Sequence, residues 1–273
     1  MIPVLFRIGP IPINSYGLML VIGFISGYFL LTAEFKRRSI PVDFASTEVT
    51  LGMIGAIIGS RIFHVFEHLD DYSWDNFGAL FKGSGFSWYG GFVLVAILVL
   101  GTARAKKISL ASLVDASSPA TAIGYAFGRI GCFLSGDGCY GHSCASLGIS
   151  LPAPFCMAFP KGAVPTSEVV FNTPVVESLL AFLTFGYLMV ARNYIKRPAG
   201  LFAQFLIIHA VLRFAIEFVR NNPDMGAGLT QAQWVSIFAA AGGVILWFAG
   251  PKIPVPVPAA AAKQPQKRSK KGR

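Results

Sequence analysis

The sequence predicts an all-α integral membrane protein with about seven transmembrane helices. Of its 273 residues, 54% are hydrophobic and only 13% are charged, whereas a soluble domain usually carries about 25% charged residues. The mean hydropathy is +0.60. Seven apolar stretches approach the length of about 20 residues that a helix needs to cross a bilayer.

The first three stretches lie at Tyr16–Ala33, Thr47–Phe66 and Trp88–Ala103. The first residues lack the basic segment and short apolar core of a cleavable signal peptide, so we expect the first span to be retained. The third stretch is short for a span, and we expect its helix to extend beyond these bounds.

The last four stretches lie at Leu113–Leu134, Pro174–Ala191, Leu201–Val219 and Thr230–Ala249. Arg129 stands inside the fourth stretch, in an otherwise apolar run that a glycine-rich turn follows. An arginine within a span costs roughly 2.5–3.5 kcal/mol on insertion scales, so it indicates a functional site.

Basic residues alternate between the loops. They follow the first, third and fifth spans, at Lys36–Arg38, Arg104–Lys107 and Arg192–Arg197, and they recur after the seventh span. The opposite loops hold few of them. The positive-inside rule therefore predicts an outer N-terminus and a cytoplasmic C-terminus. Because the net charge of +10 follows this pattern, we expect the membrane and no nucleic acid as a partner.

We expect a single membrane domain over residues 1–252, with outer loops at about 67–87 and 135–173. The second loop is longer than most structureless connections, so it predicts a small outer cap. Residues 253–273 are rich in Pro, Ala and Lys and lack core-forming side chains. We expect them to be a disordered cytoplasmic tail.

The four cysteines lie at or beyond the outer end of the fourth span, at Cys132, Cys139, Cys144 and Cys156. Their spacing is not that of a zinc site, and no nucleotide-binding loop is present, so we predict no metal and no cofactor. A disulfide among the last three fits an oxidising outer compartment. Free or weakly paired thiols are the alternative.

Polar residues from six spans converge at one depth of the membrane, in its outer half. They are Tyr16, Arg61, Tyr89, Arg129, Glu177, Arg213 and Glu217. Because guanidinium groups bind phosphate oxygens in a bidentate manner, this set predicts a pocket for a phosphate-bearing lipid. Asp137 and the turn around it are placed to orient a polar headgroup.

Other interpretations remain open at this point. Arg213 and Glu217 are four residues apart, as in a structural ion pair on one helix, and Arg61 lies near a helix end, where it can extend to the surface. A transporter is a further alternative. It predicts ionisable groups in both halves of the bilayer, but Asp115 is the lone candidate in the inner half.

Short motifs in a fixed order carry a family resemblance from Ile8 to Trp247. They are Ile8-Gly9-Pro10, Ser15–Met19, Gly55–Arg61, Ser87–Gly91, Gly128–Gly131, Thr173–Glu177, Arg213-Phe214, Glu217-Phe218 and Gly228–Thr230 with Gln233. With these motifs in this order, the chain resembles the family of bacterial phosphatidylglycerol–prolipoprotein diacylglyceryl transferases. Each motif is weak alone, but their order on seven spans is specific.

The resemblance implies a transferase with phosphatidylglycerol as its donor lipid. The acceptor is the lipobox cysteine in the signal peptide of a prolipoprotein, and glycerol 1-phosphate is released. The enzyme would be a multi-pass protein of the bacterial inner membrane, with its site facing the periplasm or cell exterior. The expected catalytic residues are Arg129, Arg213, Tyr89 and His209. The expected substrate-binding residues are Tyr16, Arg61, Ser135, Asp137, Gly141, Glu177 and Glu217.

The chain departs from the family pattern at Tyr89, where the family commonly has a histidine proposed to activate the thiol. A phenol with an ordinary pKa near 10 is a poorer base at neutral pH. Three alternatives follow: a branch that relies on its arginines, a base supplied by His209, or a lipid-binding paralogue with another acceptor or no turnover. Smaller departures occur at Cys132, Asp137, Val176 and His209.

Overall fold

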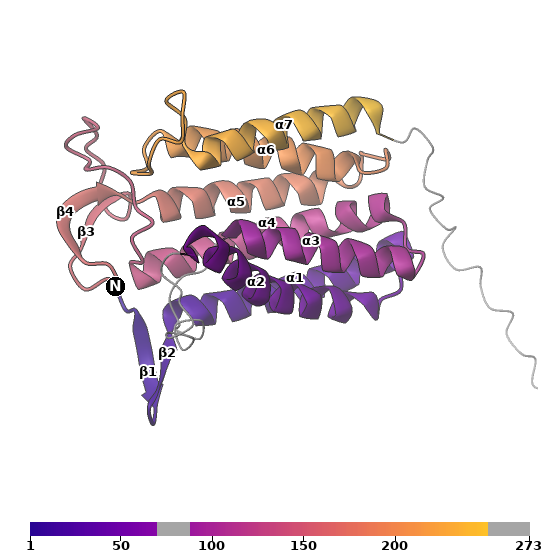
Figure 1. Cartoon of the computed structure of the whole chain (residues 1–273), viewed down its shortest axis with the longest axis horizontal. Coiled ribbons are helices and arrows are strands. Elements are labelled where there is room, and N and C mark those ends of the chain that lie inside the picture. The colour runs from indigo at the N-terminus through magenta and orange to yellow at the C-terminus, as the bar shows by residue number, and fades with distance from the viewer. Residues whose placement is uncertain (70–87, 251–273) are drawn as a thin grey trace, which may run out of the picture.

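The computed structural model describes residues 1–69 and 88–250. The sequence predictions for most of the first outer loop and for the tail concern residues outside these ranges. Within the described ranges the chain forms seven helices that pack into one bundle (Figure 1). They are α1 (Ser15–Arg38), α2 (Phe44–Glu67), α3 (Trp88–Ala105), α4 (Leu110–Ser135), α5 (Thr173–Ala191), α6 (Gly200–Glu217) and α7 (Gln231–Ala249).

Five of the described helices, α1, α2, α5, α6 and α7, are long and apolar enough to cross a membrane. The apolar part of α3, Tyr89–Ala105, is shorter. Helix α4 carries Asp115 and Arg129, and it packs between α1 and α5, where neighbouring helices cover its polar groups. The helices confirm the predicted helical membrane fold.

Two pairs of helices within the bundle pack closely against each other. Helix α2 packs against α3, and α6 packs against α7 (Figure 1). The α2–α3 contact depends on small residues, because a Cβ atom on Gly59 or Gly90 would collide with the facing helix. A buried core forms where the C-terminal end of α1 meets the N-terminal ends of α2 and α4. It includes the side chains of Phe35, Phe44 and Leu113.

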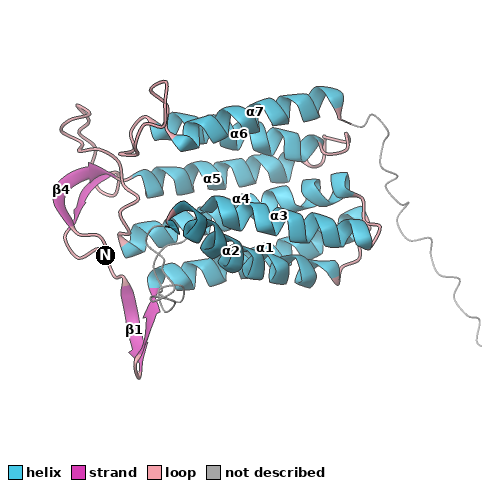
Figure 2. Ribbon diagram, in the orientation of Figure 1, coloured by secondary structure: helices cyan, strands magenta, loops and turns pink. Residues whose placement is uncertain are grey.

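Two small antiparallel hairpins stand at one end of the bundle (Figure 2). Strands β1 (Val4–Ile8) and β2 (Ile11–Asn14) turn at Gly9, whose φ is +60°. Strands β3 (Cys156–Phe159) and β4 (Thr166–Phe171) lie between α4 and α5. The sequence analysis did not anticipate these two hairpins, because short strands give weak sequence signals beside apolar spans.

The loop between α4 and α5, residues 136–172, folds as a segment that we call the outer segment after its predicted side of the membrane. A disulfide joins Cys144 to Cys156, which decides between the two alternatives left open for these cysteines. Cys132 and Cys139 are free thiols. The backbone N–H of His142 donates to the carbonyl of Val219 at 2.9 Å, which ties the segment to the end of α6.

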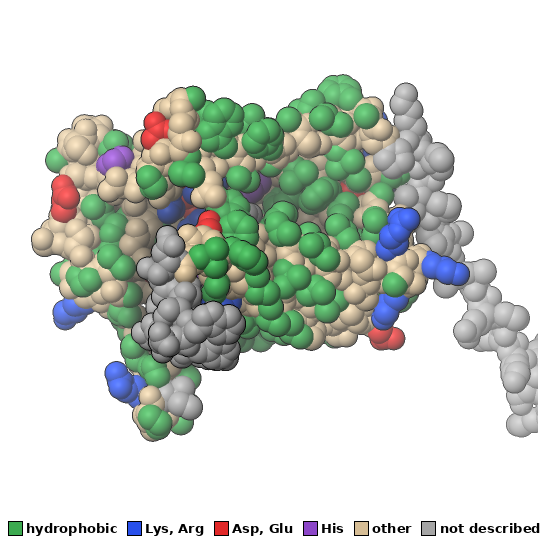
Figure 3. Space-filling model, viewed as in Figure 1, with side chains coloured by type: hydrophobic (Ala, Val, Ile, Leu, Met, Phe, Trp, Pro, Cys, Tyr) green, Lys and Arg blue, Asp and Glu red, His purple; other side chains and the backbone are tan. Residues whose placement is uncertain are grey.

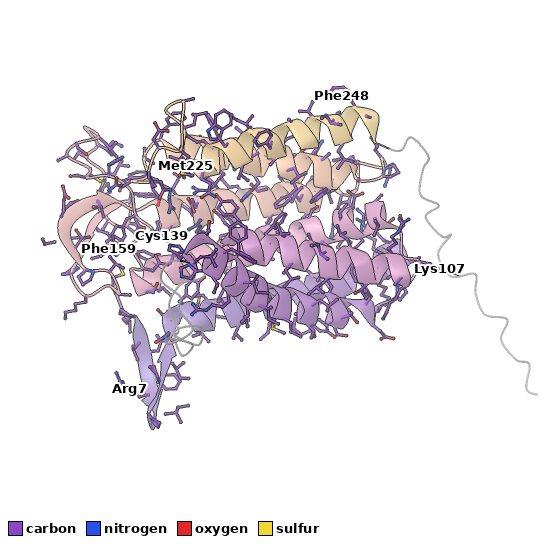
Figure 4. All side chains as sticks on the ribbon, viewed as in Figure 1. Arg7, Lys107, Cys139, Phe159, Met225 and Phe248 are labelled. Carbon is purple, nitrogen blue, oxygen red and sulfur yellow. A yellow bond between two sulfur atoms is a disulfide. The ribbon has the colours of Figure 1, made fainter. Side chains whose placement is uncertain are left out.

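The basic loops share the opposite end of the bundle. Figure 4 shows Lys107 at that end and Arg7 and Cys139 at the other. At the end that carries Lys107, the fully buried Glu34 forms ion pairs with Arg37 at 2.7 Å, with Arg38 at 3.5 Å and with Arg192.

Asp115 belongs to the same end and has a structural role. Its carboxylate lies 3.4 Å from Arg38 and accepts the backbone N–H of Phe202 at 2.9 Å. Asp115 thus links α4 to α1 and α6. These contacts give a structural role to the acidic residue on which the transporter alternative depends.

Candidate functional site

Glu177 is the centre of an ion cluster between α4, α5 and α6. Pro174 lies in the first turn of α5, where its missing N–H has no helical partner to lose, and Glu177 follows one turn later. The Glu177 carboxylate pairs with Arg129 of α4, with Arg213 of α6 at 3.3 Å and with Arg220 just beyond α6 at 3.4 Å. One carboxylate therefore positions arginines from three segments.

A second carboxylate, Glu217, supports the same arginines. It lies 2.7 Å from Arg213, one helical turn earlier, and 3.7 Å from Arg220. Its Oε1 accepts hydrogen bonds from Thr230, at 2.9 Å, and from Asn222. The predicted structural pair of Arg213 and Glu217 therefore exists, and it is part of a larger network.

The charges of the cluster are arranged asymmetrically. The side chains of Glu177 and Glu217 are 4% and 0% exposed, whereas those of Arg129, Arg213 and Arg220 are 16%, 18% and 10% exposed. The carboxylates thus lie behind the guanidinium groups. Three positive charges face two negative ones in this described cluster, so one positive charge remains for an anionic ligand.

Tyr125 connects two members of the cluster. Its hydroxyl donates to Glu177 at 3.0 Å and accepts from Arg129 Nε at 3.0 Å. The Arg129 guanidinium lies 5.0 Å from the centre of the Tyr125 ring, within the range of a cation–π contact. These contacts fix the Arg129 side chain in one orientation.

His209 lies one turn before Arg213 and belongs to the apolar side of the site. Its ring meets Tyr125 edge-on at 4.9 Å and stacks on Phe205 at 5.6 Å. A narrow crevice of about 20 Å³ runs between Tyr125, His209 and Leu212. Figure 3 shows a hollow between the α6–α7 pair and the α2–α3 pair, where charged and histidine side chains are visible among apolar ones.

Tyr16 and Tyr89 lie at the first turns of α1 and α3, at the same end of the bundle as the cluster. Tyr16 is in electrostatic contact with Arg129 and packs on Gly131, where a Cβ atom would lie 2.9 Å from the Tyr16 ring. Tyr89 lies close enough to Arg213 and Glu217 for their charges to act on its hydroxyl group. Arg61 lies in the second half of α2, which packs mainly against α3.

Two predicted substrate-binding residues have structural contacts. Ser135 is buried and donates to the carbonyl of Cys132 at 3.2 Å. A Cβ atom on Gly141 would collide with the carbonyl of Val219, so glycine permits the approach of the outer loop to α6. For both residues the contacts account for the residue type without a substrate.

Asp137 is part of a cluster that the sequence analysis did not anticipate. Ligand atoms of Cys132, Asp137 and Cys139 all lie within 4.8 Å of one another. Gly136 ends α4 with φ +60°, and the reversal folds the next residues back over Cys132. A hydrogen bond from Cys132 lowers the pKa of the Cys139 thiol to about 7. The spacing of these residues in the sequence did not indicate that their side chains would meet.

Sequence reasoning also missed Tyr125 and Arg220 as members of the site. Tyr125 lies four residues before Arg129, so the two share a helix face. Arg220 lies three residues after Glu217, beyond the apolar run. Both spacings were available signals, but only packing shows that these faces meet Glu177.

A second, polar cavity of about 440 Å³ opens in the outer segment beside the cluster. Arg220 belongs to its lining, so the cavity reaches the ion cluster around Glu177. Its other lining side chains include Tyr140, His142, Ser143, Glu168 and Asn222.

Comparisons with known proteins agree on one family. The profile described as "Prolipoprotein diacylglyceryl transferase" matches residues 3–249. Three relatives bear the name phosphatidylglycerol–prolipoprotein diacylglyceryl transferase. One from Leptospira interrogans (strain Fiocruz L1-130) is 33% identical, covering 77% of this chain and 72% of its own. One from Dehalococcoides mccartyi (strain BAV1) is 32% identical, covering 90% and 92%. One from Geobacter sulfurreducens is 32% identical, covering 83% and 85%.

Proposed function

Because this chain belongs to the prolipoprotein diacylglyceryl transferase family, we propose that the ion cluster around Glu177 is its active site. The chain is a transferase that moves the diacylglyceryl group of phosphatidylglycerol to a prolipoprotein. The observation that supports the site is the set of three partly exposed guanidinium groups held by one buried carboxylate.

The donor lipid is bound through its phosphate. Arg129 and Arg213 offer planar donor groups that match phosphate oxygens, and the net positive charge of the cluster complements the phosphodiester. The small apolar crevice beside His209 and Leu212 lies next to these arginines, since Glu177 and Arg213 belong to its lining. Tyr16 faces the same region from α1.

The acceptor approaches from the outer segment. The segment of a signal peptide that carries the lipobox cysteine has backbone N–H and C=O groups that need hydrogen-bond partners. The polar cavity beside Arg220 provides side-chain donors and acceptors for them. This cavity and the donor site share the arginine cluster, so the two substrates meet there.

The reaction is a displacement at carbon. The thiolate sulfur attacks the glyceryl carbon that carries the phosphate ester, a C–S bond forms, and the C–O bond to phosphate breaks. The electron pair leaves with glycerol 1-phosphate, whose new negative charge the guanidinium groups stabilise in a site of low dielectric constant. The thiol proton passes to a base, for which Tyr89 and His209 are the candidates among the predicted catalytic residues.

We place the site in the outer half of the bacterial inner membrane, facing the periplasm or cell exterior. The basic loops at the opposite end of the bundle support this orientation. The disulfide between Cys144 and Cys156 fits an oxidising compartment on the side of the cluster.

The experiment that tests this function uses the purified protein, phosphatidylglycerol vesicles and a synthetic lipobox peptide. We expect release of glycerol phosphate and a peptide mass increased by one diacylglyceryl group. The Arg129→Ala and Arg213→Ala variants should each lower kcat by about 10²–10³-fold, because each removes a donor to the developing charge.

Arg104→Ala is the matched control, since Arg104 is an exposed arginine in the last turn of α3 at the other end of the bundle. It should keep the wild-type rate. Near-normal transfer by either cluster variant would refute the role of that arginine, and no glycerol phosphate release by the wild type would refute the proposed reaction.

A further inference from the structure

The arginines of the cluster differ in which nitrogen atom meets the carboxylates. Arg129 pairs with Glu177 Oε2 through Nε. Arg213 uses Nη1 instead, which lies 3.3 Å from Glu177 Oε1 and 2.7 Å from Glu217 Oε2. Within the described ranges, the terminal nitrogens of Arg129 make one hydrogen-bond contact, a weak one from Nη1 to Cys132 Sγ at 4.0 Å. The Nη1/Nη2 edge of Arg129 is therefore the edge available to a ligand.

The Tyr125 hydroxyl lies at the point where Arg129 meets its carboxylate. It accepts the Nε–H of Arg129 at 3.0 Å and donates to Glu177 Oε2 at 3.0 Å. Arginine and carboxylate groups frequently pair through two parallel N–H bonds, which would turn one terminal nitrogen of Arg129 toward Glu177. The hydroxyl occupies Oε2 beside Nε, and Oε1 is held by Arg213 and Arg220. Both groups therefore oppose that rotation of the guanidinium.

The ring of Tyr125 is itself held by packing against α6. It meets the His209 ring edge-on at 4.9 Å, and His209 stacks on Phe205 at 5.6 Å. The Arg129 guanidinium lies 5.0 Å from the centre of the Tyr125 ring on the same side of the site. A group that touches substrate is placed accurately only when its neighbours are fixed by packing and hydrogen bonds. Tyr125 provides both kinds of contact to Arg129.

We propose that Tyr125 is a positioning residue for the transfer of the diacylglyceryl group. Its hydroxyl holds Arg129 by Nε, so that the two terminal nitrogens of the guanidinium face the phosphate of the donor lipid. In this role, which rests on the proposed function, Tyr125 acts through Arg129 and does not touch the lipid.

The consequence of this role belongs to the transition state. As the C–O bond breaks, negative charge grows on the phosphate, and donors aligned in advance stabilise it without reorganisation. Binding of the lipid depends less on this alignment, because the net positive charge of the cluster remains when the hydroxyl is removed. Loss of the Tyr125 hydroxyl should therefore lower kcat more than it raises KM.

The test starts with Tyr125→Phe, which removes one oxygen atom and keeps the ring. Transfer from phosphatidylglycerol vesicles to the lipobox peptide is followed by glycerol phosphate release. We expect kcat to fall by about 10–100-fold, as for a displaced catalytic group, with KM for phosphatidylglycerol close to its wild-type value. The unfolding temperature in detergent is measured on the same samples.

Tyr187→Phe is the matched control. The Tyr187 hydroxyl also joins two helices, since it donates to Gln204 at 2.5 Å across α5 and α6. Neither residue belongs to the ion cluster or to the lining of the crevice beside it. This variant should keep the wild-type kcat and KM, and Tyr125→Phe should unfold no earlier than it does.

A double-mutant cycle identifies the group through which Tyr125 acts. Lysine at position 129 has no Nε–H to be held, so Tyr125→Phe should cause no further fall in kcat in an Arg129→Lys background. In an Arg213→Lys background the fall should be as large as in the wild type. Equal falls in both backgrounds would show that Tyr125 does not act through Arg129.

Three other results overturn the positioning role. They are a wild-type kcat for Tyr125→Phe, a rise in KM with kcat unchanged, and a lower unfolding temperature than that of Tyr187→Phe, which would make the hydroxyl a structural contact. In each case the wild-type protein remains active and the proposed function stands. No transfer by the wild-type protein would overturn the proposed function, and the role of Tyr125 with it.

Discussion

At the scale of the residue, Glu177 illustrates how a buried charge is tolerated in a membrane protein. Removal of a carboxylate from water costs several kcal/mol unless partners repay it, and Glu177 has contacts with Arg129, Arg213, Arg220 and the Tyr125 hydroxyl. The same contacts keep the guanidinium groups apart and pointed at one region. Glu177 thus acts through the arginines, as a positioning residue.

This role predicts a combined effect for Glu177→Gln. The neutral amide leaves mutually repelling guanidinium groups, so we expect a loss of about 3–5 kcal/mol of stability together with a large fall in kcat. Thermal unfolding in detergent and the glycerol phosphate assay measure the two effects.

Glu168→Gln is the matched stability control, because Glu168 lies exposed on β4. Its unfolding temperature should stay at the wild-type value. If Glu177→Gln unfolds at the same temperature as Glu168→Gln, the carboxylate does not hold the cluster together.

At the scale of the element, small residues set how closely α3 approaches α2. A Cβ atom on Gly90 would collide with the side chain of Phe63 and with the carbonyl of Gly59. Gly55 has a similar contact, since its added Cβ atom would lie 3.0 Å from Val95. The glycines of the family motifs in α2 and α3 are therefore explained by packing, independently of any substrate.

Gly90→Val should accordingly destabilise the α2–α3 pair. Overpacking of this kind costs typically about 1–3 kcal/mol, and here backbone atoms are among those that must move. The measurement is the unfolding temperature in detergent.

Gly101→Val provides the control on the same helix, because no atom lies within 4 Å of an added Cβ atom there. A valine is slightly better than glycine in a helix, so this variant should match or exceed the wild type. Equal losses at both positions would show that helix propensity, rather than the helix contact, decides the effect.

At the scale of the whole molecule, the bundle separates two kinds of charge network. One end holds Glu34 and Asp115, whose ion pairs join α1 to α4 and whose hydrogen bond from Phe202 joins α4 to the start of α6. The other end holds the Glu177 cluster, the hairpins and the outer segment. The first network joins helices through structural contacts, and the second leaves guanidinium groups partly exposed.

The proposed orientation of the bundle can be tested with reporter fusions. Alkaline phosphatase needs disulfides and is active only in an oxidising compartment, whereas green fluorescent protein reports the cytoplasm. Fusions after Lys161, in the outer segment, should be active with the phosphatase and dark with the fluorescent protein. Fusions after Lys107 should show the reverse, because that loop carries the basic residues. Fluorescence from the Lys161 fusion would contradict the orientation.

The sequence by itself determined the helices and the candidate arginines. Apolar runs are local signals, because each span must satisfy its own backbone within the bilayer, so Thr173–Ala191 closely matches the predicted Pro174–Ala191. A charge inside such a run, as at Arg129, is also visible without a fold. The order of the motifs was sufficient to identify the family.

Only the tertiary structure decided which residues meet. Tyr125 and Arg220 joined the cluster, and Cys132 met Asp137 and Cys139 across a left-handed turn. Such contacts depend on the rotation of each helix about its axis and on how a loop folds back. Neither is encoded in the hydropathy of a single span, because the packing of neighbouring helices and loops sets both.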